Sequence, residues 1–380
     1  MKKILFVIPK LATGGTNSSL SSLYPLLKER FDISVFSISH HPISHNYSFC
    51  EVLQRKDYLL SLIYSNYSDL NGYDKLVALL VKSIKLICKR IGVDIGLHRF
   101  ISTIRRLESE NSFDYIIGYQ EGNATLFASL FSNPNKIAWI HADYNEYLPS
   151  EKTEESIYTR FKTIVSVSNY TTGVFARRYP SLADRAIAVH NVLDIPRIKH
   201  LAEQPIDDSR FNTEKYTIIS VGRFGKVKRF SEIPAVASEL NHRGMEFVWY
   251  VLGPRYQIEE VEAFKSNLQK FCMHDKVIWL GGKSNPYPYF KAANLYVCLS
   301  ETEACPMVFK EALLFGCPVV TTDFPSSYEF IHDNDGRIAP FDKLPDAISD
   351  MKERYDRGYR IQPHEEDTKE LVDKLCSILK

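Results

Sequence analysis

The stretch LYVCLSETEACPMVFKEA, residues 295–312, contains the unit from which we predict the fold. Its apolar start, residues 295–299, has the length of one buried strand, and a polar loop leads from it to a helix that we expect to begin near Met307 or Val308. The loop holds Glu303, and Glu311 follows on the first turns of the helix. A strand, a loop and a helix in this order are typical of parallel sheets whose strands are joined by crossover helices.

The same unit recurs along both halves of the chain, where short β-branched or aromatic runs alternate with segments of helical period. We expect strands at residues 3–9, 32–39, 115–119, 136–141, 163–168 and 186–189, and again at 216–221, 246–252, 277–280, 295–299 and 318–321. The predicted class is α/β, with two Rossmann-like, doubly wound parallel-sheet domains. Because ligands bind at the carboxyl ends of such strands, we expect the two domains to face a shared cleft.

Chain length also favours two domains, since 380 residues exceed the size of one ordinary domain. We expect a first domain over residues 1–195, a polar, proline-punctuated linker over 196–212 and a second domain over 213–365. Residues 366–380 carry an apolar stripe at Leu371, Leu375 and Leu379. This stripe predicts a C-terminal helix that packs back toward the first domain.

Charge and cysteine content exclude several classes of protein. Lys and Arg number 47 against 46 Asp and Glu, so there is no overall positive field of the kind that marks a dedicated nucleic-acid binder. The seven cysteines form an odd set without a C-x-x-C pair, which supports neither a disulfide framework nor a zinc ribbon. A reducing, cytoplasmic setting fits best, and the apolar runs are shorter than the roughly 20 residues of a membrane span.

Two glycine-containing loops after predicted strands suit an anionic ligand. In the first, Gly14, Gly15 and Thr16 lead into a helix whose free N–H groups favour an anion, although a tight turn alone would also explain the glycines. In the second, residues 222–229, four cations lie within seven residues, including Arg223 and Lys228. The alternative is a solvated charged turn, but the neighbouring glycine lets the backbone approach a pyrophosphate as well.

Three further features carry chemistry in one interpretation and only structure in another. Glu303 and Glu311 are either solvated carboxylates or acceptors for sugar hydroxyls beside a phosphate site. His141, at another strand end, is either a satisfied structural histidine or a binding residue. The run Asp333-Asn334-Asp335 spells a D-x-D pattern, but we expect no metal there.

Taken in this order, the motifs resemble the GT-B glycosyltransferases of retaining family 4 over nearly the whole chain. The resemblance rests on the glycine turn Gly14-Gly15, His141, Gly222-Arg223, Lys228 and the E-x7-E pair Glu303 and Glu311, with lesser matches at Asn191, Gly253, Gly281 and residues 328–336. Two positions depart from the family: Ala304-Cys305 replaces the common Gly-Phe, and Arg229 stands where Gly often follows the Lys.

The resemblance implies a nucleotide-diphosphate sugar, such as a UDP-sugar, as donor substrate and no other cofactor. The residues implied to bind the donor are Gly14, Gly15, Thr16, Gly222, Gly253, Gly281, Cys305, Pro306, Met307, Val308 and Glu311, and those implied in catalysis are His141, Arg223, Lys228 and Glu303. Among these, Arg223 and Lys228 would hold the diphosphate, Glu311 the ribose hydroxyls, and Glu303 the transferred sugar.

The resemblance further implies a retaining, metal-independent hexosyltransferase. Its acceptor would be a hydroxyl of a surface glycan, most often a lipid-linked precursor of capsule, exopolysaccharide or O-antigen. We expect front-face attack in which a departing phosphate oxygen accepts the proton and Glu303 positions the sugar. Two other classes stay open: a catalytically silent glycan-binding or scaffold subunit of the same fold, and a nicotinamide dehydrogenase, which the missing G-x-G-x-x-G disfavours.

Two segments of the first half concern partners. Residues 44–73, rich in Tyr and Ser, are our candidate for acceptor recognition. Between Lys75 and Arg106 there are eight cations and one acid, and the apolar residues from Val77 to Ile91 share one side of a helix. This amphipathic helix is either an ordinary surface helix packed on the first domain or a site that attracts anionic lipid on the inner face of the plasma membrane.

Overall fold

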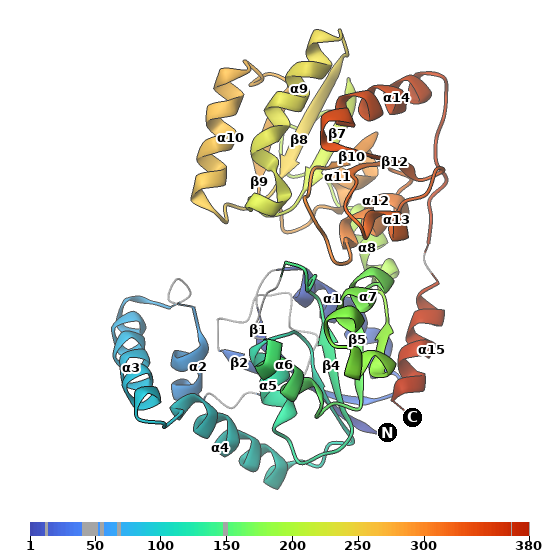
Figure 1. Cartoon of the computed structure of the whole chain (residues 1–380). Helices are drawn as coiled ribbons and strands as arrows, with labels where there is room; N and C mark the ends of the chain where they lie inside the picture. Colours follow the sequence, from blue (N-terminus) through green and yellow to red (C-terminus); the bar gives the residue numbers. More distant parts are fainter. Residues whose placement is uncertain are drawn as a thin grey trace. The chain divides into compact units, whose positions relative to one another are not determined.

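The computed structural model describes residues 1–11, 14–39, 52–53, 57–66, 70–146, 151–365 and 367–379. The chain divides into two compact units (Figure 1). The first unit comprises Met1–Val192 together with Thr368–Lys380, and the second comprises Leu193–Asp367. The expected acceptor segment, residues 44–73, lies partly outside the described residues.

The first unit is built on a six-stranded sheet in the order β2-β1-β3-β4-β5-β6, with every described pair parallel. Its strands are β1 (Lys3–Lys10), β2 (Asp32–Ser39), β3 (Tyr115–Gly118), β4 (Lys136–Ile140), β5 (Thr163–Ser166) and β6 (Ala186–Ala188). Its helices are α1 (Gly15–Lys28), α2 (Tyr58–Tyr64), α3 (Gly72–Arg90), α4 (Ile95–Glu110), α5 (Asn123–Ser129), α6 (Glu151–Tyr158), α7 (Asn169–Arg178) and α15 (Thr368–Ile378). Residues 4–8 of β1 are all buried, as expected for a strand covered on both faces.

The second unit has a six-stranded parallel sheet in the order β12-β11-β10-β7-β8-β9. Its strands are β7 (Tyr216–Val221), β8 (Phe247–Leu252), β9 (Val277–Gly281), β10 (Leu295–Cys298), β11 (Val319–Thr322) and β12 (Gly336–Ala339). Its helices are α8 (Ile195–Ala202), α9 (Ile233–His242), α10 (Ile258–Lys270), α11 (Tyr287–Ala292), α12 (Met307–Leu314), α13 (Ser327–Phe330) and α14 (Leu344–Asp356). One core lies between the sheet and α9, α10 and α14, and a second lies between its other face and α11 to α13.

The predicted α/β class with two doubly wound parallel sheets is confirmed, and the eleven expected strands occur within two residues of their expected ends. Strand β12, whose four residues begin with Gly336, is not among the expected strands. A Cβ at Gly336 would lie 1.7 Å from the carbonyl oxygen of Val319 on β11. This strand therefore depends on a close backbone approach, which β-propensity does not report.

Residues 196–212, expected as a linker, differ from that expectation because they begin within α8 and pack on the second unit. Asp194 caps α8 by accepting the N–H of Arg197, and Pro196 stands in its first turn, where a proline is compatible with a helix. Farther along, Asp208 pairs with Lys283 at 3.1 Å. The proline that suggests a break in the sequence therefore helps to start a helix.

Residues 75–106 form two helices instead of one. Helix α3 ends at Arg90, Gly92 follows with a positive φ of 84°, and Asp94 caps α4 by accepting the N–H of Leu97. Because glycine adopts positive φ without a steric penalty, Gly92 marks the break between the helices. Within the described residues, no helix combines the length and the apolar character that a bilayer-spanning segment needs.

Helix α15 belongs to the first unit by its contacts. Asp373 forms an ion pair with Arg30 at 2.5 Å, and the carbonyl oxygen of Leu379 accepts a hydrogen bond from Lys2 at 3.3 Å. Leu375 is fully buried, and it lines a small cavity together with Leu23 of α1. The C-terminal stripe therefore packs on the first unit.

Candidate functional site

The candidate site of the second unit lies where the strand order of its sheet reverses. Strand β7 has β8 on one side and β10 on the other, so the loops after β7 and β10 start side by side at the carboxyl edge. In open parallel sheets this reversal leaves a crevice in which ligands bind. The expected residues Gly222, Arg223 and Lys228 follow β7, and Glu303 follows β10.

Lys228 and Glu303 bridge the two loops. Lys228 Nζ forms an ion pair with Glu303 Oε1, and both side chains are largely buried. Burial opposes the charge of Lys228, but the charge and hydrogen bond of Glu303 outweigh it and raise the pKa of Lys228 above its ordinary value. Lys228 is therefore a cation held at the reversal point.

The Glu303 carboxylate is fixed by a second contact, and its backbone by a third. Ser300 Oγ donates to Glu303 Oε1 at 2.7 Å, and Ser326 Oγ donates to the carbonyl oxygen of Glu303. Neither serine is among the expected site residues. Ser300 lies within residues 295–312, directly after the expected strand, which is a weak sequence signal for a site residue. Ser326 follows a different strand and carries no such signal.

Close backbone packing shapes the loop after β7. The Gly222 N–H donates to the carbonyl oxygen of Leu252 at 2.9 Å, and the Gly253 N–H donates to Gly281 at 2.8 Å. A Cβ at Gly253 would lie only 2.0 Å from the carbonyl oxygen of Gly222. Gly281 follows with a φ of +81°, a conformation that favours glycine. The three glycines therefore support the loop by backbone geometry.

Two other cations of this loop, Arg223 and Arg229, stand apart from the Lys228–Glu303 pair. The exposed Arg223 guanidinium lies over the Tyr256 ring, 4.5 Å from its centroid. Arg229 pairs with Glu301 at 2.9 Å and adopts a φ of 51° in the left-handed region. The glycine usual at this position in the resembling family would take that conformation without strain, whereas an arginine pays for it.

Helix α12 supplies a third side of the candidate site. Pro306 precedes its first turn, so the N–H groups of Met307 and Val308 have no acceptor within the helix. Cys305 in the loop before it is partly buried. Amide groups at a helix start present partial positive charge, which suits a phosphate.

Glu311 lies on the same helix and is buried. Burial raises its pKa to about 7, and the hydroxyl of Tyr287, which donates to Glu311 at 3.4 Å, offsets part of that rise. Tyr287 is a further residue that the sequence analysis misses. A carboxyl group with a pKa near 7 can ionise when a ligand offers it hydroxyl donors.

The first unit holds the remaining expected residues. Gly14 is the N-cap residue of α1, so the N–H groups of Gly15 and Thr16 have no acceptor within that helix. His141 follows β4, and its ring lies 4.7 Å from that of Tyr119, measured between centroids. Burial lowers the pKa of His141 to about 3, so its imidazole is neutral near pH 7.

A carboxylate that the sequence analysis misses holds His141 in place. Glu121, after β3, accepts the backbone N–H of His141 at 2.9 Å, and burial raises the pKa of Glu121. His141 Nε2 is buried and has no hydrogen-bond partner among the residues that the structure describes. The ring is thus oriented by its surroundings while one nitrogen stays available to a ligand.

The lesser match Asn191 belongs to a buried network beside His141. Ser19 Oγ donates to Asn191 Oδ1 at 2.6 Å and shares a hydrogen bond of 2.7 Å with the hydroxyl of Tyr119. The network links the helix after β1 to the end of β3 and to the segment after β6. Asn191 therefore has a structural role in this unit.

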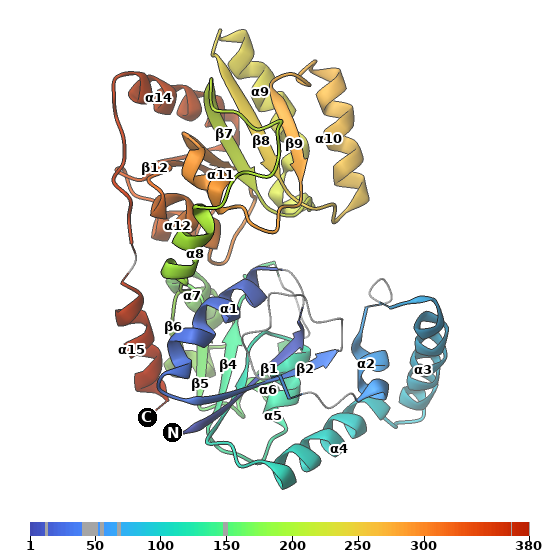
Figure 2. The same cartoon turned by 180° about the vertical axis from the view of Figure 1, so that it is seen from behind.

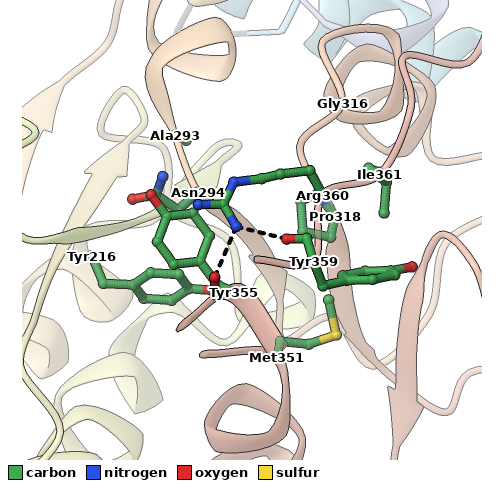
Figure 3. Close-up of a pocket in the computed structure, with 10 residues that line it drawn as sticks. All are labelled: Tyr216, Ala293, Asn294, Gly316, Pro318, Met351, Tyr355, Tyr359, Arg360 and Ile361. Atoms are coloured by element: carbon green, nitrogen blue, oxygen red, sulfur yellow. Dashed lines mark hydrogen bonds between the residues drawn. The ribbon is translucent and has the colours of Figure 1, made fainter. Parts of the chain in front are cut away.

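A cavity of about 60 Å³ lies elsewhere in the second unit (Figure 3). It is lined at the amino ends of three strands, near Tyr216, Asn294 and Pro318, and Arg360 donates to the carbonyl oxygens of Tyr355 and Tyr359 beside it. The candidate site is at the opposite, carboxyl edge. An open hollow of about 350 Å³ does lie at that edge, lined by Arg210, Arg255, Trp279, Leu280, Gly281 and Gly282.

The described residues contain neither a cluster of potential metal ligands nor a disulfide. No group of three or more His, Cys, Asp or Glu side chains gathers there, and the cysteines of that part of the chain are free. Within the D-x-D run, Asp335 accepts the N–H of His332 at 3.1 Å in the turn before β12. That contact gives Asp335 a role in the turn.

Part of the chain matches a known protein family. The family model described as Glycosyl transferases group 1 matches residues 203–371. The chain is 21% identical over 326 residues to the N-acetylgalactosamine-N,N'-diacetylbacillosaminyl-diphospho-undecaprenol 4-alpha-N-acetylgalactosaminyltransferase of Campylobacter jejuni, covering 86% of this chain and 82% of that protein. It is 25% identical over 328 residues to an uncharacterized glycosyltransferase of Haemophilus influenzae, covering 84% and 80%.

Solved structures share the fold at low sequence identity. The crystal structure of HepE from Anabaena in complex with UDP and glucose matches with a TM-score of 0.65 and 14% identity, over 93% of this chain and 91% of that chain. Together with the two six-stranded parallel sheets, this likeness assigns the fold. Residues 203–371 therefore match the family model of glycosyl transferases group 1, and the chain has the GT-B fold of glycosyltransferases.

Proposed function

We propose that this protein is a retaining, metal-independent hexosyltransferase that moves a sugar from a nucleotide-diphosphate sugar to a hydroxyl of a lipid-linked glycan. The observation that carries the proposal is the Lys228–Glu303 ion pair at the strand reversal of the second unit. It joins the cation that would bind the diphosphate to the carboxylate that would bind the sugar. Each group stands at the end of a neighbouring strand.

Breaking the bond between sugar and diphosphate leaves a more negative nucleotide. Lys228, Arg223 and the amide groups of Met307 and Val308 supply fixed positive charge where that negative charge develops. Such groups accelerate a reaction because they bind the transition state more strongly than the ground state. At about 1.5 to 3 kcal/mol for each charge-assisted hydrogen bond, two of them would contribute roughly 10²- to 10⁴-fold in rate. The proposal therefore includes no metal ion.

Donor binding would exchange the partners of the ion pair. A diphosphate oxygen would replace Glu303 as the partner of Lys228, and the released carboxylate would then accept hydrogen bonds from hydroxyls of the transferred sugar. The departing phosphate oxygen would take the proton of the attacking acceptor hydroxyl on the same face of the sugar. Under this scheme Glu303 positions the sugar and forms no covalent bond to it.

Glu311 and His141 would complete the contacts to the donor. The carboxylate of Glu311 would accept from ribose hydroxyls, and the hollow beside Trp279 and Gly281 has room for the base. His141, with a neutral ring and a free buried nitrogen, would donate to or accept from a sugar hydroxyl. UDP is the nucleotide named for the similar HepE structure, and we propose a UDP-sugar as donor.

For the acceptor, we propose a lipid-linked precursor of capsule, exopolysaccharide or O-antigen. The similar Campylobacter jejuni enzyme is named for a diphospho-undecaprenol acceptor, which supports this class. Such an acceptor would place the protein at the inner face of the plasma membrane.

Thermal shifts with UDP-, GDP- and ADP-sugars test the donor, because a ligand at 100 times its dissociation constant stabilises by about 2.7 kcal/mol. We expect one nucleotide class to raise the melting temperature and the purified protein to hydrolyse that donor slowly with release of the α-anomer. Binding without any hydrolysis or transfer would favour a silent subunit of the same fold. Release of the β-anomer, or a glycosyl adduct trapped on Glu303, would contradict retention by front-face attack.

A further inference from the structure

Helix α3 exposes its apolar side. Of its 19 residues only Ala78 is buried. Six apolar residues along its outer side are between 52% and 74% exposed, the last of them directly after the helix: Leu76, Leu79, Leu80, Ile84, Ile87 and Ile91. We call them the α3 apolar face. In both views α3 lies at the edge of the first unit, with α2 between it and the sheet (Figures 1 and 2).

The polar side of α3 points inward, which reverses the usual arrangement of a surface helix. Lys82 Nζ donates to the carbonyl oxygen of Ser65 at 2.6 Å. Lys85 Nζ lies over the ring of Tyr64, 4.5 Å from its centroid. These contacts fix the rotation of α3 about its own axis, so the apolar face cannot turn inward without losing them.

Helix α3 carries a net positive charge. Helix α3 carries Lys75, Lys82, Lys85, Lys89 and Arg90 against one acid, Asp74. Asp74 already accepts a hydrogen bond from the hydroxyl of Tyr58, and the next acid along the chain, Asp94, caps α4. Lys89 and Arg90 are exposed at the end of the helix. An apolar stripe with exposed cations at its C-terminal end and no unengaged acid on the helix complements an anionic surface that has an apolar interior.

We propose that the α3 apolar face docks on a lipid leaflet that contains anionic phospholipids, with the axis of α3 in the plane of the leaflet. At 1.5 Å per residue the helix is about 28 Å long, so its leucine and isoleucine side chains reach the boundary of headgroups and acyl chains together. Lys89 and Arg90 lie at the headgroup level. This binding does not depend on the transfer reaction, and it brings the first unit to the surface that holds a lipid-linked acceptor.

A second copy of the chain is the other partner that could cover the α3 apolar face. Charge favours the leaflet, because each copy would bring the exposed Lys89 and Arg90 to the contact, whereas Asp74, the acid of α3, is already engaged. Like charges across an interface oppose association. Anionic lipid instead attracts each basic residue near the surface by about fivefold in affinity.

Flotation of the full chain with lipid vesicles tests the proposal. The probes are neutral phosphatidylcholine vesicles and vesicles in which about one third of the lipid is phosphatidylglycerol. We expect at least about tenfold stronger binding to the anionic vesicles, and weaker binding when salt is raised. Equal binding to both vesicles, or binding to neither, overturns the proposal.

Variants at two matched isoleucines distinguish vesicle binding by the α3 apolar face from nonspecific binding through any exposed apolar residue. Ile87 on α3 and Ile258 on α10 are 61% and 56% exposed, and they lie in different units. We expect Ile87→Asp to weaken binding to anionic vesicles by at least about tenfold and Ile258→Asp to leave it unchanged. Both variants should keep the wild-type melting temperature and the wild-type response to nucleotide, which separates a lost surface from a lost fold or donor site. Unchanged flotation of Ile87→Asp overturns the proposal, and so does a concentration-dependent dimer that Ile87→Asp abolishes without any vesicle binding.

Discussion

Lys228 and Glu303 form an ion pair between the loops that follow β7 and β10, the two strands at which the strand order of the second unit reverses. The pair holds a cation at the carboxyl edge of the sheet. Under the proposed donor site its two members have opposite expected effects: removal of Lys228 takes away a partner of the diphosphate, whereas neutralisation of Glu303 frees that partner.

Exchange of the pair predicts distinct effects of Glu303→Gln and Lys228→Met on UDP affinity. Glu303→Gln should bind UDP no more weakly than the wild type, because Lys228 loses a competing carboxylate, yet transfer should fall by at least about 10²-fold. Lys228→Met should weaken UDP binding by at least about tenfold. Lys226→Met is the matched control, since Lys226 is an exposed cation of the same loop. Isothermal titration with UDP measures all three, and equal weakening by Lys226→Met and Lys228→Met would contradict the assigned diphosphate contact.

Glu311 predicts a pH dependence of donor binding. Its pKa of about 7 means that it is largely protonated at about pH 6, whereas ribose hydroxyls favour the ionised form. Affinity for a UDP-sugar should therefore rise about tenfold between about pH 6 and about pH 8, and Glu311→Gln should abolish the rise. In the unliganded protein the sign is reversed. The stability that this group contributes is present below its ordinary pKa of 4.5 and is lost as pH rises through about 7. A wild-type affinity that stays flat over this range would count against the ribose contact.

His141 predicts a loss of catalysis without a loss of nucleotide binding. His141→Ala should lower transfer by about 10²-fold or more, because one hydrogen bond to the reacting sugar is removed. The UDP-induced thermal shift should stay at the wild-type value, since we assign the nucleotide to the second unit. His274→Ala, at an exposed histidine, is the control. Because burial holds the pKa of His141 near 3, transfer should show no titration of this group between about pH 5 and about pH 8.

Because Gly253 packs closely on the backbone of Gly222, we expect a steric clash at Gly253 to be enough to disable the site. The added methyl of Gly253→Ala would lie 2.0 Å from the Gly222 carbonyl oxygen, so the loop that carries Lys228 must move. We expect a loss of about 1 to 3 kcal/mol in the free energy of unfolding and at least about tenfold weaker UDP binding. At Gly225 the nearest atoms to an added Cβ are 3.7 Å away, an ordinary contact, so Gly225→Ala should be tolerated. Chemical denaturation and titration of both variants measure the difference.

Sequence patterns predict the strands of this chain well because buried parallel strands are continuous apolar runs. Strand β8, with six buried residues in a row, is the clearest case. The same reasoning overlooks β12, which depends on how closely Gly336 lets it approach β11. It also treats Pro196 as a break, although a proline in a first helical turn is compatible with the helix that follows.

Side-chain contacts made across the fold are harder to predict. The spacing of Glu303 and Glu311 marks both carboxylates, but it does not reveal that Lys228 pairs with one and Tyr287 with the other. Glu121 belongs to no sequence motif. It accepts the backbone N–H of His141, which follows a neighbouring strand. These partners come from separate loops that only the folded sheet brings together.

The rotation of α3 is a further property that periodicity does not give. The helical period shows that Leu80, Ile84 and Ile87 share a side, but it does not say whether that side faces the core or the solvent. The contacts of Lys82 and Lys85 with the C-terminal end of α2, at Tyr64 and Ser65, determine that the side faces the solvent. Apolar spacing therefore predicts the existence of the stripe and not its partner.

A crystal structure of the protein with its nucleotide-sugar donor would show whether Lys228 holds the diphosphate. We expect the diphosphate to lie at the carboxyl edge of the second unit, within hydrogen-bond distance of Lys228 Nζ and of the amide groups of Met307 and Val308, with Glu303 turned to the sugar hydroxyls. A diphosphate bound elsewhere on the chain, with the Lys228–Glu303 ion pair still intact, would contradict it.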